Sequence, residues 1–144
     1  MSRSLVILGS TGSIGTQALQ VVGAHADTFD VVALAAGGSN PVLLADQVLD
    51  HRPAAVALAG GDGGDFSAVL TDRAAQRGTP VPPVQIHTGA RAATELAGMG
   101  ADVVLNGITG ALGLESTLAA LRAGRRLALA NKESLIIGGP LVRD

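Results

Sequence analysis

Three glycines near the N-terminus are spaced three residues apart in the segment GSTGSIG, residues 9–15. Four apolar residues, 5–8, precede the first glycine, and an apolar-periodic run follows the last one. This order predicts a buried strand, a tight turn and a helix, an arrangement that points free backbone N–H groups at a phosphate. We expect Gly9 to make the turn and Gly15 to pack the helix on the strand. We expect Gly12 to let a phosphate approach and to adopt a conformation closed to valine. Because it lies at a strand-to-helix joint, the pattern favours a dinucleotide site for NAD(P) over a purely structural turn.

Three later loops also follow expected strands and carry small or amide-bearing residues, at 37–40, 106–110 and 131–134. In an open parallel sheet, ligands bind at the carboxyl ends of the strands. An NAD site normally has an acid after the second strand, and loop 37–40 has none, which favours NADP. Ser39 and Asn40 could bond a 2′-phosphate, although the loop holds no Arg or Lys.

Each of these loops has a plainer interpretation. Asn40 is well placed to cap a helix that begins at Pro41. Loop 106–110 is either a ligand contact or an irregular connection, because glycines serve both purposes. Lys132 and Glu133 are either cofactor or phosphate contacts or an ordinary solvated helix start.

Apolar segments alternate with helical patterns along the whole chain. The expected strands and short extended segments are 5–8, 31–36, 54–59, 84–87, 101–105 and 126–130. The first expected helix directly follows Gly12. The others lie at 41–52, 66–76, 88–99 and 112–123, and helix 66–76 has Asp65 as its N-cap and Gly78 just past its end. This alternation predicts an α/β fold, a Rossmann-like doubly wound parallel sheet with helices on both faces.

The composition argues against several classes of partner and location. The 144 residues fit one domain, 47% hydrophobic and 15% charged, with a net charge of −2. That charge, and two Phe without Trp or Tyr, argue against nucleic acid as a partner. No apolar run is long enough for a membrane helix, and there is no cysteine, so we expect a cytoplasmic protein. The three histidines share no metal-ligand spacing, and segment 60–65 lacks the pattern of a calcium loop, so we expect no metal site.

Three segments carry a resemblance to a known family: LGSTGSIG (8–15), NGITGALGLESTLAALRAG (106–124) and LALANKESLIIGG (127–139). Together they resemble the N-terminal NADPH-binding domain of 1-deoxy-D-xylulose 5-phosphate reductoisomerase. The resemblance covers essentially the whole chain, so residues 1–144 are expected to form that domain. It implies an NADPH-dependent enzyme of the non-mevalonate isoprenoid pathway. Such an enzyme rearranges and reduces the phosphosugar 1-deoxy-D-xylulose 5-phosphate to 2-C-methyl-D-erythritol 4-phosphate.

The resemblance also assigns roles to residues. It implies that the pyrophosphate is lined by Thr11, Gly12, Ser13 and Ile14. It implies that the adenosine ribose-phosphate end is held by Gly37, Gly38 and Asn40. Asn131 and Glu133 would contact the cofactor, and Lys132 would bind the substrate. A divalent metal, Mg or Mn, and a homodimer are implied for the full-length enzyme, with the metal ligands outside this chain.

One departure from the family and two competing classes matter here. The family often has a basic residue in the second loop, where this chain has Gly38 and Ser39. A short-chain dehydrogenase would need a Tyr-x-x-x-Lys general acid, and the chain has no tyrosine. A module that binds or senses NAD(P) without chemistry remains the alternative, because no general acid, nucleophile or metal site is evident in the chain.

Overall fold

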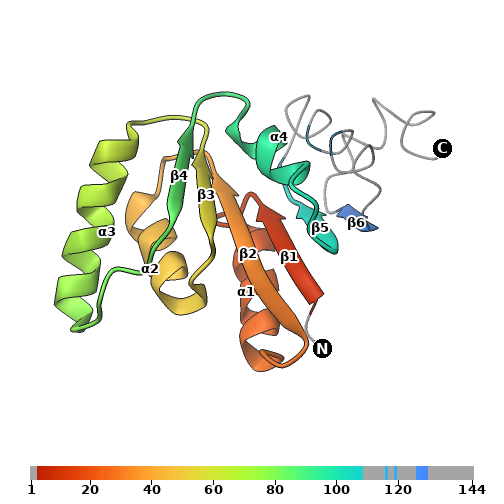
Figure 1. Ribbon diagram of the computed structural model, residues 1–144, viewed down its shortest axis with the longest axis horizontal. Helices are drawn as coiled ribbons and strands as arrows, with labels where there is room; N and C mark the ends of the chain where they lie inside the picture. The colour runs from red at the N-terminus through yellow and green to blue at the C-terminus, as the bar shows by residue number, and fades with distance from the viewer. Residues whose placement is uncertain (1–2, 109–115, 117–118, 120–125, 130–144) are drawn as a thin grey trace.

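A six-stranded sheet with the strand order β4-β3-β2-β1-β5-β6 forms the centre of the molecule. The computed structural model describes residues 3–108, 116, 119 and 126–129 (Figure 1). The strands are β1 (Arg3–Leu8), β2 (Phe29–Ala36), β3 (Ala55–Leu58), β4 (Gln85–Thr88), β5 (Val103–Asn106) and β6 (Arg126–Leu129). The helices are α1 (Ser13–Ala24), α2 (Pro41–His51), α3 (Gly63–Arg77) and α4 (Ala92–Ala97). Every strand pair is parallel, which confirms the expected doubly wound α/β fold.

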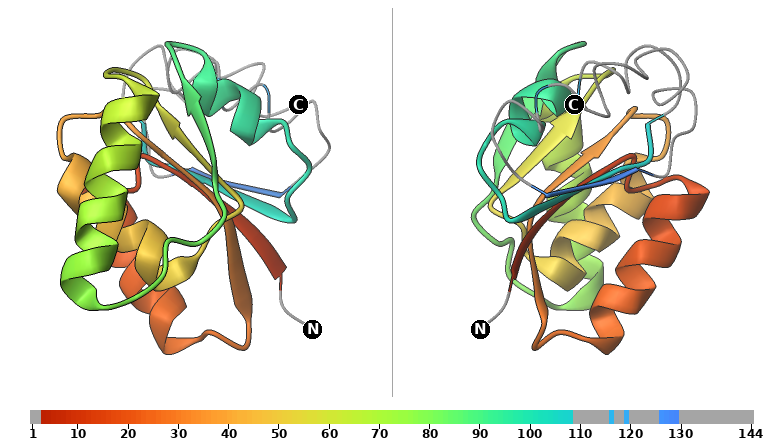
Figure 2. Two further views of the ribbon diagram at one scale, coloured as in Figure 1. Left: turned by 60° about the vertical axis from the view of Figure 1, so that its left-hand side comes forward. Right: turned by 90° about the vertical axis from the view of Figure 1, so that its right-hand side faces the viewer.

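The helices cover both faces of the sheet: α1, α2 and α3 lie on one side and α4 lies on the other (Figure 2). Successive side chains of a strand point to opposite faces. Along β1, Leu5 and Ile7 therefore belong to the core under α1–α3, whereas Val6 and Leu8 belong to the core under α4. A strand buried on both faces must be apolar at every position, which explains its continuous apolar run.

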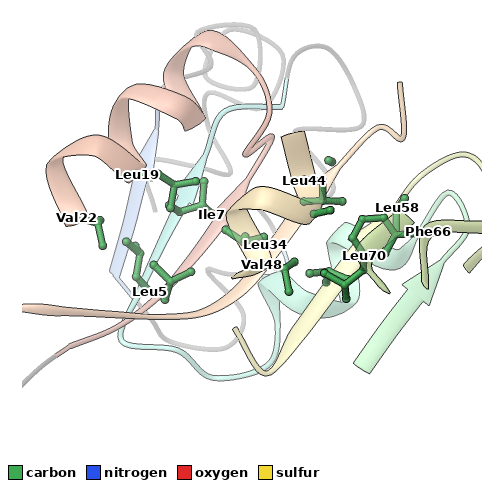
Figure 3. Packing of buried hydrophobic residues seen from close by; sticks show 14 residues of the cluster. Leu5, Ile7, Leu19, Val22, Leu34, Leu44, Val48, Leu58, Phe66 and Leu70 are labelled. Atoms are coloured by element: carbon green, nitrogen blue, oxygen red, sulfur yellow. The ribbon is translucent and has the colours of Figure 1, made fainter. Parts of the chain in front are cut away.

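The larger core lies under α1, α2 and α3 (Figure 3). Ile7 and Leu34 of the sheet pack there with Leu19 of α1, while Phe66 and Leu70 bring α3 to the same cluster. The opposite core is lined by small residues of β2 and β3, namely Ala33, Ala35, Ala55 and Ala57. Small side chains let α4 lie close to the sheet, so the alanine-rich strands have a packing reason.

Ion pairs on the surface join α2 to α3. The edge of the Arg73 guanidinium that carries Nε and Nη2 faces Asp46, with Nε–Oδ1 and Nη2–Oδ2 distances of 3.0 and 3.1 Å. Arg77 Nη2 lies 2.6 Å from Asp50 Oδ1. These contacts are partly exposed, so they mainly fix how the two helices are aligned.

Two expected helix starts are wrong. The third helix begins at Gly63 and not at Phe66, because Asp62 Oδ1 accepts from the Gly64 N–H at 2.6 Å, so Asp62 and not Asp65 is its cap. The fourth helix does not begin at Thr88, because that residue pairs with Leu58 at the end of β4. The expected helix 112–123 lies largely outside the described residues. Within the described part of the chain, no helix is long and apolar enough to cross a membrane.

Candidate functional site

The order in which strands are added to the sheet reverses between β1 and β5. From β1 the chain proceeds through β2, β3 and β4 on one side, while β5 pairs with β1 on its other side. Ligands of open α/β sheets bind at the carboxyl ends of the strands beside this point. The loop after β1 consists of residues 9–12 and leads into α1, and Leu8 is aligned with Asn106 at the end of β5. The first and third loops therefore meet at the switch point.

The glycine turn is held from two sides. Gly9 has a φ of 80°, which favours glycine, as expected for the tight turn. The Gly9 and Ser10 N–H groups both donate to the Ala35 carbonyl oxygen, at 2.8 and 2.9 Å. On the other side, a Cβ on Gly9 would lie 3.2 Å from the Gly107 carbonyl carbon. Little room remains for the turn to shift.

Gly15 packs the first turn of α1 directly on this loop. A Cβ at Gly15 would lie 2.3 Å from the Gly9 carbonyl oxygen and 2.6 Å from Ser10 Cα. Both obstacles are backbone atoms, so the loop itself would have to move. Gly15 therefore allows the close packing that the sequence predicts, but the contact is with the loop after β1 and not with the strand itself.

We predict that Gly15→Ala lowers the free energy of unfolding by about 3 kcal/mol, the upper end of the cost of overpacking a core. Urea unfolding followed by circular dichroism measures this change. Gly23→Ala, in the same helix and with open space around it, is the matched control and should not destabilise the chain. Equal stabilities for the two variants would contradict the close contact.

The N-terminus of α1 has no side-chain cap. Its N-cap is Gly12, whereas Asn40 caps α2 and Asp62 caps α3 with side-chain oxygens. The first N–H groups of a helix have no partner within the helix. With a glycine as N-cap, those of α1 are left to solvent or to an anion, which the helix dipole also attracts.

The conformation expected of Gly12 is wrong. Its φ and ψ are −80° and 177°, an extended conformation that any residue adopts. A Cβ there would meet only the Gly9 carbonyl oxygen, at 3.4 Å, an ordinary contact. The fold therefore does not require glycine at this position, and the expected close approach of a phosphate stays a prediction.

The other three residues of the predicted pyrophosphate site surround this helix start. Thr11 is half-buried, and Ser13 is exposed on the first turn. Ile14 is 45% exposed although it is a large apolar side chain. It lies next to Gly107, so first-loop and third-loop residues share one surface. An apolar side chain exposed beside free N–H groups suits a ligand with both apolar and anionic parts.

The second loop is built against the end of β3. Asn40 Oδ1 accepts from the Leu43 N–H at 3.3 Å, which confirms its capping role. Gly60 N–H donates to the Gly37 carbonyl oxygen at 3.0 Å. A Cβ on Gly38 would lie 2.4 Å from the Gly60 carbonyl oxygen, so the two backbones touch. Sequence reasoning did not assign this supporting role to Gly60, although the Gly60-Gly61 pair after a strand was a usable signal.

Two acids at the start of α3, the helix that follows β3, lie close to the second loop. A cavity of about 210 Å³ is lined by Gly38 and Gly60 together with Asp62 and Asp65. One oxygen of Asp62 is already engaged by the Gly64 N–H. Loop 37–40 itself carries no acid, as the sequence shows, but the fold brings these two carboxylates close to it.

The third loop has an internal structural role in its described part. Asn106 is fully buried, and its Oδ1 accepts from the Ile108 N–H at 3.0 Å. Gly107 N–H donates to the Leu8 carbonyl oxygen at 2.9 Å. These bonds support the connection interpretation for 106–108. The fourth loop, with Asn131, Lys132 and Glu133, lies outside the described residues.

A small cavity joins the first and second loops. It has a volume of about 140 Å³ and opens where β1, β2 and β3 end. Its lining includes Gly9, Gly37 and Ile108 from the three loops, with Thr94 of α4. A larger groove of about 720 Å³ runs between α1 and α2, but it contains none of residues 9–15. Of these two cavities, the small one is therefore the one that lies at the glycine turn.

Sequence reasoning missed one residue beneath the glycine loop. Gln47 of α2 is 6% exposed, and its Nε2 donates to the Ser10 carbonyl oxygen at 2.8 Å. The only signal was a polar residue on the helix face that carries Leu44 and Val48.

Two groups in the described part of the chain have a clearly shifted pKa, and neither of them lies in these loops. Burial lowers the pKa of His51, at the end of α2, against a smaller opposing effect of Asp50. A hydrogen bond to Asp50 raises the pKa of the exposed Arg77. Within the described residues, no group of three or more His, Cys, Asp or Glu side chains could hold a metal ion. In its described part the candidate site consists mainly of backbone N–H groups and small side chains, with the larger Ile14 beside them.

A comparison with models of protein families identifies the family of the chain. The family model described as 1-deoxy-D-xylulose 5-phosphate reductoisomerase matches residues 5–139. The chain belongs to this family. The resemblance seen in the three sequence segments is thereby confirmed.

Individual relatives agree with the family assignment. The 1-deoxy-D-xylulose 5-phosphate reductoisomerase of Pseudarthrobacter chlorophenolicus is 53% identical over 98% of this chain, which covers 36% of that protein. That of Beutenbergia cavernae is 55% identical over 99% of this chain, which covers 34% of it. The chain spans about a third of the length of the curated relatives it matches.

Solved structures of reductoisomerases share the fold. The enzyme from Zymomonas mobilis in complex with NADPH is 37% identical, with a TM-score of 0.82, over 99% of this chain and 35% of that one. A reductoisomerase in complex with NADPH, fosmidomycin and magnesium is 36% identical, with a TM-score of 0.80, over 98% of this chain and 33% of that one. The strand order and the loops described above thus belong to a known reductoisomerase fold.

Proposed function

We propose that residues 1–144 are the NADPH-binding domain of a 1-deoxy-D-xylulose 5-phosphate reductoisomerase. The observation that carries this proposal is the uncapped N-terminus of α1 behind the glycine turn at the switch point. Family membership and the NADPH complex of the Zymomonas mobilis relative support the same assignment. The full-length enzyme would rearrange and reduce its phosphosugar substrate, with NADPH as the hydride donor. We also propose a cytoplasmic location and, as the family resemblance implies, a homodimer.

The pyrophosphate is proposed to lie at the start of α1. The N–H groups of the first turn, at Ser13 and Ile14, face no side-chain cap and can donate to phosphate oxygens. Gly12 keeps that approach free of a side chain, and the exposed Ile14 covers the apolar part of the ligand. Thr11 supplies a further N–H and a hydroxyl at the same edge.

The adenosine end is proposed to lie on the second loop. Gly37 has no neighbour within 4 Å of a Cβ position, so its backbone is open to a ribose-phosphate. Gly38 holds the loop in place through its contact with Gly60. Asn40 uses Oδ1 as a helix cap, which leaves its Nδ2 to donate to a phosphate oxygen.

The nicotinamide and substrate end is proposed for the fourth loop. Asn131 and Glu133 would contact the cofactor, and Lys132 would donate a hydrogen bond to a phosphate or carbonyl oxygen of the substrate. The described residues do not fit the divalent metal of the full-length enzyme, because they bring no three ligands together. No metal step is therefore assigned to this part of the chain.

We expect the chain to bind NADPH about fivefold more tightly than NADH, which corresponds to about 1 kcal/mol, the net worth of one hydrogen bond. The preference is small because Ser39 and Asn40 offer polar groups but no positive charge, and because Asp62 and Asp65 lie near the loop. Calorimetric titration with both nucleotides at one ionic strength measures it. Equal affinity or a preference for NADH would contradict the proposed 2′-phosphate contact.

A further inference from the structure

Gln47 is a buried amide that joins two segments far apart in the chain. It lies on α2 between the buried faces of Leu44 and Val48, both 0% exposed, and is itself 6% exposed. Its Nε2 donates to the Ser10 carbonyl oxygen at 2.8 Å across 37 residues of sequence. Burying an amide costs free energy unless its polar atoms are hydrogen-bonded. The bond to Ser10 satisfies Nε2, so it offsets only part of that cost.

The carbonyl oxygen of the Gln47 side chain makes no hydrogen bond that would stabilise the fold within the described residues. Gln47 Oε1 is buried without a hydrogen-bond partner among them, and so is Ser10 Oγ. An unpaired buried acceptor destabilises a fold, and an unbranched apolar side chain of similar length would avoid it. The contribution of Gln47 is therefore better explained by where it holds Ser10 than by stability.

The peptide between Ser10 and Thr11 shows what that position does. The peptide unit is planar and trans, so its C=O and N–H bonds point in opposite directions. Gln47 draws the Ser10 carbonyl towards α2, while the Ser10 N–H is fixed on the Ala35 carbonyl oxygen at 2.9 Å. With the carbonyl directed towards α2, the Thr11 N–H is directed away from it.

We propose that Gln47 is a positioning residue of the nucleotide site, which fixes the Ser10–Thr11 peptide so that the Thr11 N–H faces the pyrophosphate. This inference rests on the proposed function. The same helix carries Asn40 at its N-terminus, so α2 supports both the pyrophosphate loop and the loop proposed for the 2′-phosphate. Gln47 thus sets the first loop relative to the second.

The test is Gln47→Met, which keeps the length of the side chain and its helix propensity but removes the donor. We expect the Kd for NADPH to rise about tenfold, since a displaced N–H loses a charge-assisted bond. The Kd for adenosine 2′-monophosphate, which has no pyrophosphate, should stay within about twofold. The melting temperature should change by less than about 4 °C. Gln20→Met is the matched control, because Gln20 is exposed in the same groove between α1 and α2.

Amide hydrogen exchange without nucleotide gives an independent reading. In Gln47→Met the Thr11 amide should exchange faster, while amides in β3 and α3 keep the rates of the unmodified chain. Unchanged exchange together with unchanged NADPH affinity would overturn the inference. Equal losses for both ligands, or a loss of stability that unfolds the variant, would assign Gln47 a purely structural role and overturn it as well. Failure of the unmodified chain to bind NADPH would instead count against the proposed function, while the exchange rates still decide the role of Gln47.

Discussion

Gly12→Val is expected to weaken NADPH binding by at least about 100-fold while the fold is retained. A branched side chain at the N-cap of α1 would occupy the space in front of the free N–H groups of the first turn. Losing two charge-assisted hydrogen bonds, each worth about 1.5–3 kcal/mol, accounts for an effect of this size. Calorimetry measures the affinity, and circular dichroism measures the fold.

The structure makes this variant a clean test. Gly12 has an extended conformation open to valine, and a Cβ there meets its nearest neighbour at 3.4 Å. Gly23→Val places the same side chain in the same helix, at a position with open space, and should leave NADPH binding unchanged. If Gly12→Val bound NADPH normally, the glycine loop would be only a structural turn.

The second large effect is an absence of turnover. We expect the 144-residue chain to bind NADPH but not to oxidise it when 1-deoxy-D-xylulose 5-phosphate and Mg²⁺ or Mn²⁺ are added. The rearrangement breaks a carbon–carbon bond and builds negative charge on substrate oxygens, which a metal held by several carboxylates would stabilise. The acids of the described residues do not gather into such a group. NADPH absorbance at a fixed substrate concentration measures the rate.

A chimera provides the matched control for turnover. Joining this chain to the remaining two thirds of the Pseudarthrobacter chlorophenolicus relative, of which it covers 36%, should restore NADPH oxidation. Lys132→Ala in that chimera should remove most of the restored rate, since the lysine is proposed to hold the substrate. Substantial oxidation by the 144-residue chain alone would show that a complete active site lies within it.

Strands and their order along the chain were readily predicted, because local patterns determine them. Two apolar runs predict β1 and β2, and the glycines between the first run and α1 predict the turn of the first βα unit. The helix starts were less certain. Both Asp62 and Asp65 precede an apolar run in a glycine-rich segment, and only the observed bond to the Gly64 N–H selects the first of them.

Contacts between distant segments were not predictable from spacing. Gly60 supports Gly38, and Gln47 holds Ser10, because the sheet order brings β3 and α2 beside the first two loops. The same order brings Asp62 towards the second loop, although no acid follows β2. Such pairs depend on tertiary packing, which a single sequence does not display.

The most direct measurement is a two-dimensional ¹⁵N–¹H NMR titration of the 144-residue chain with NADPH. A pyrophosphate at the start of α1 should move the amide signals of Thr11, Gly12, Ser13 and Ile14 most, with a second group of shifts at 37–40. Amides that line the groove between α1 and α2, such as Ala26, should hardly move. Saturable shifts centred on that groove, with residues 11–14 unchanged, would contradict a dinucleotide site at the glycine turn.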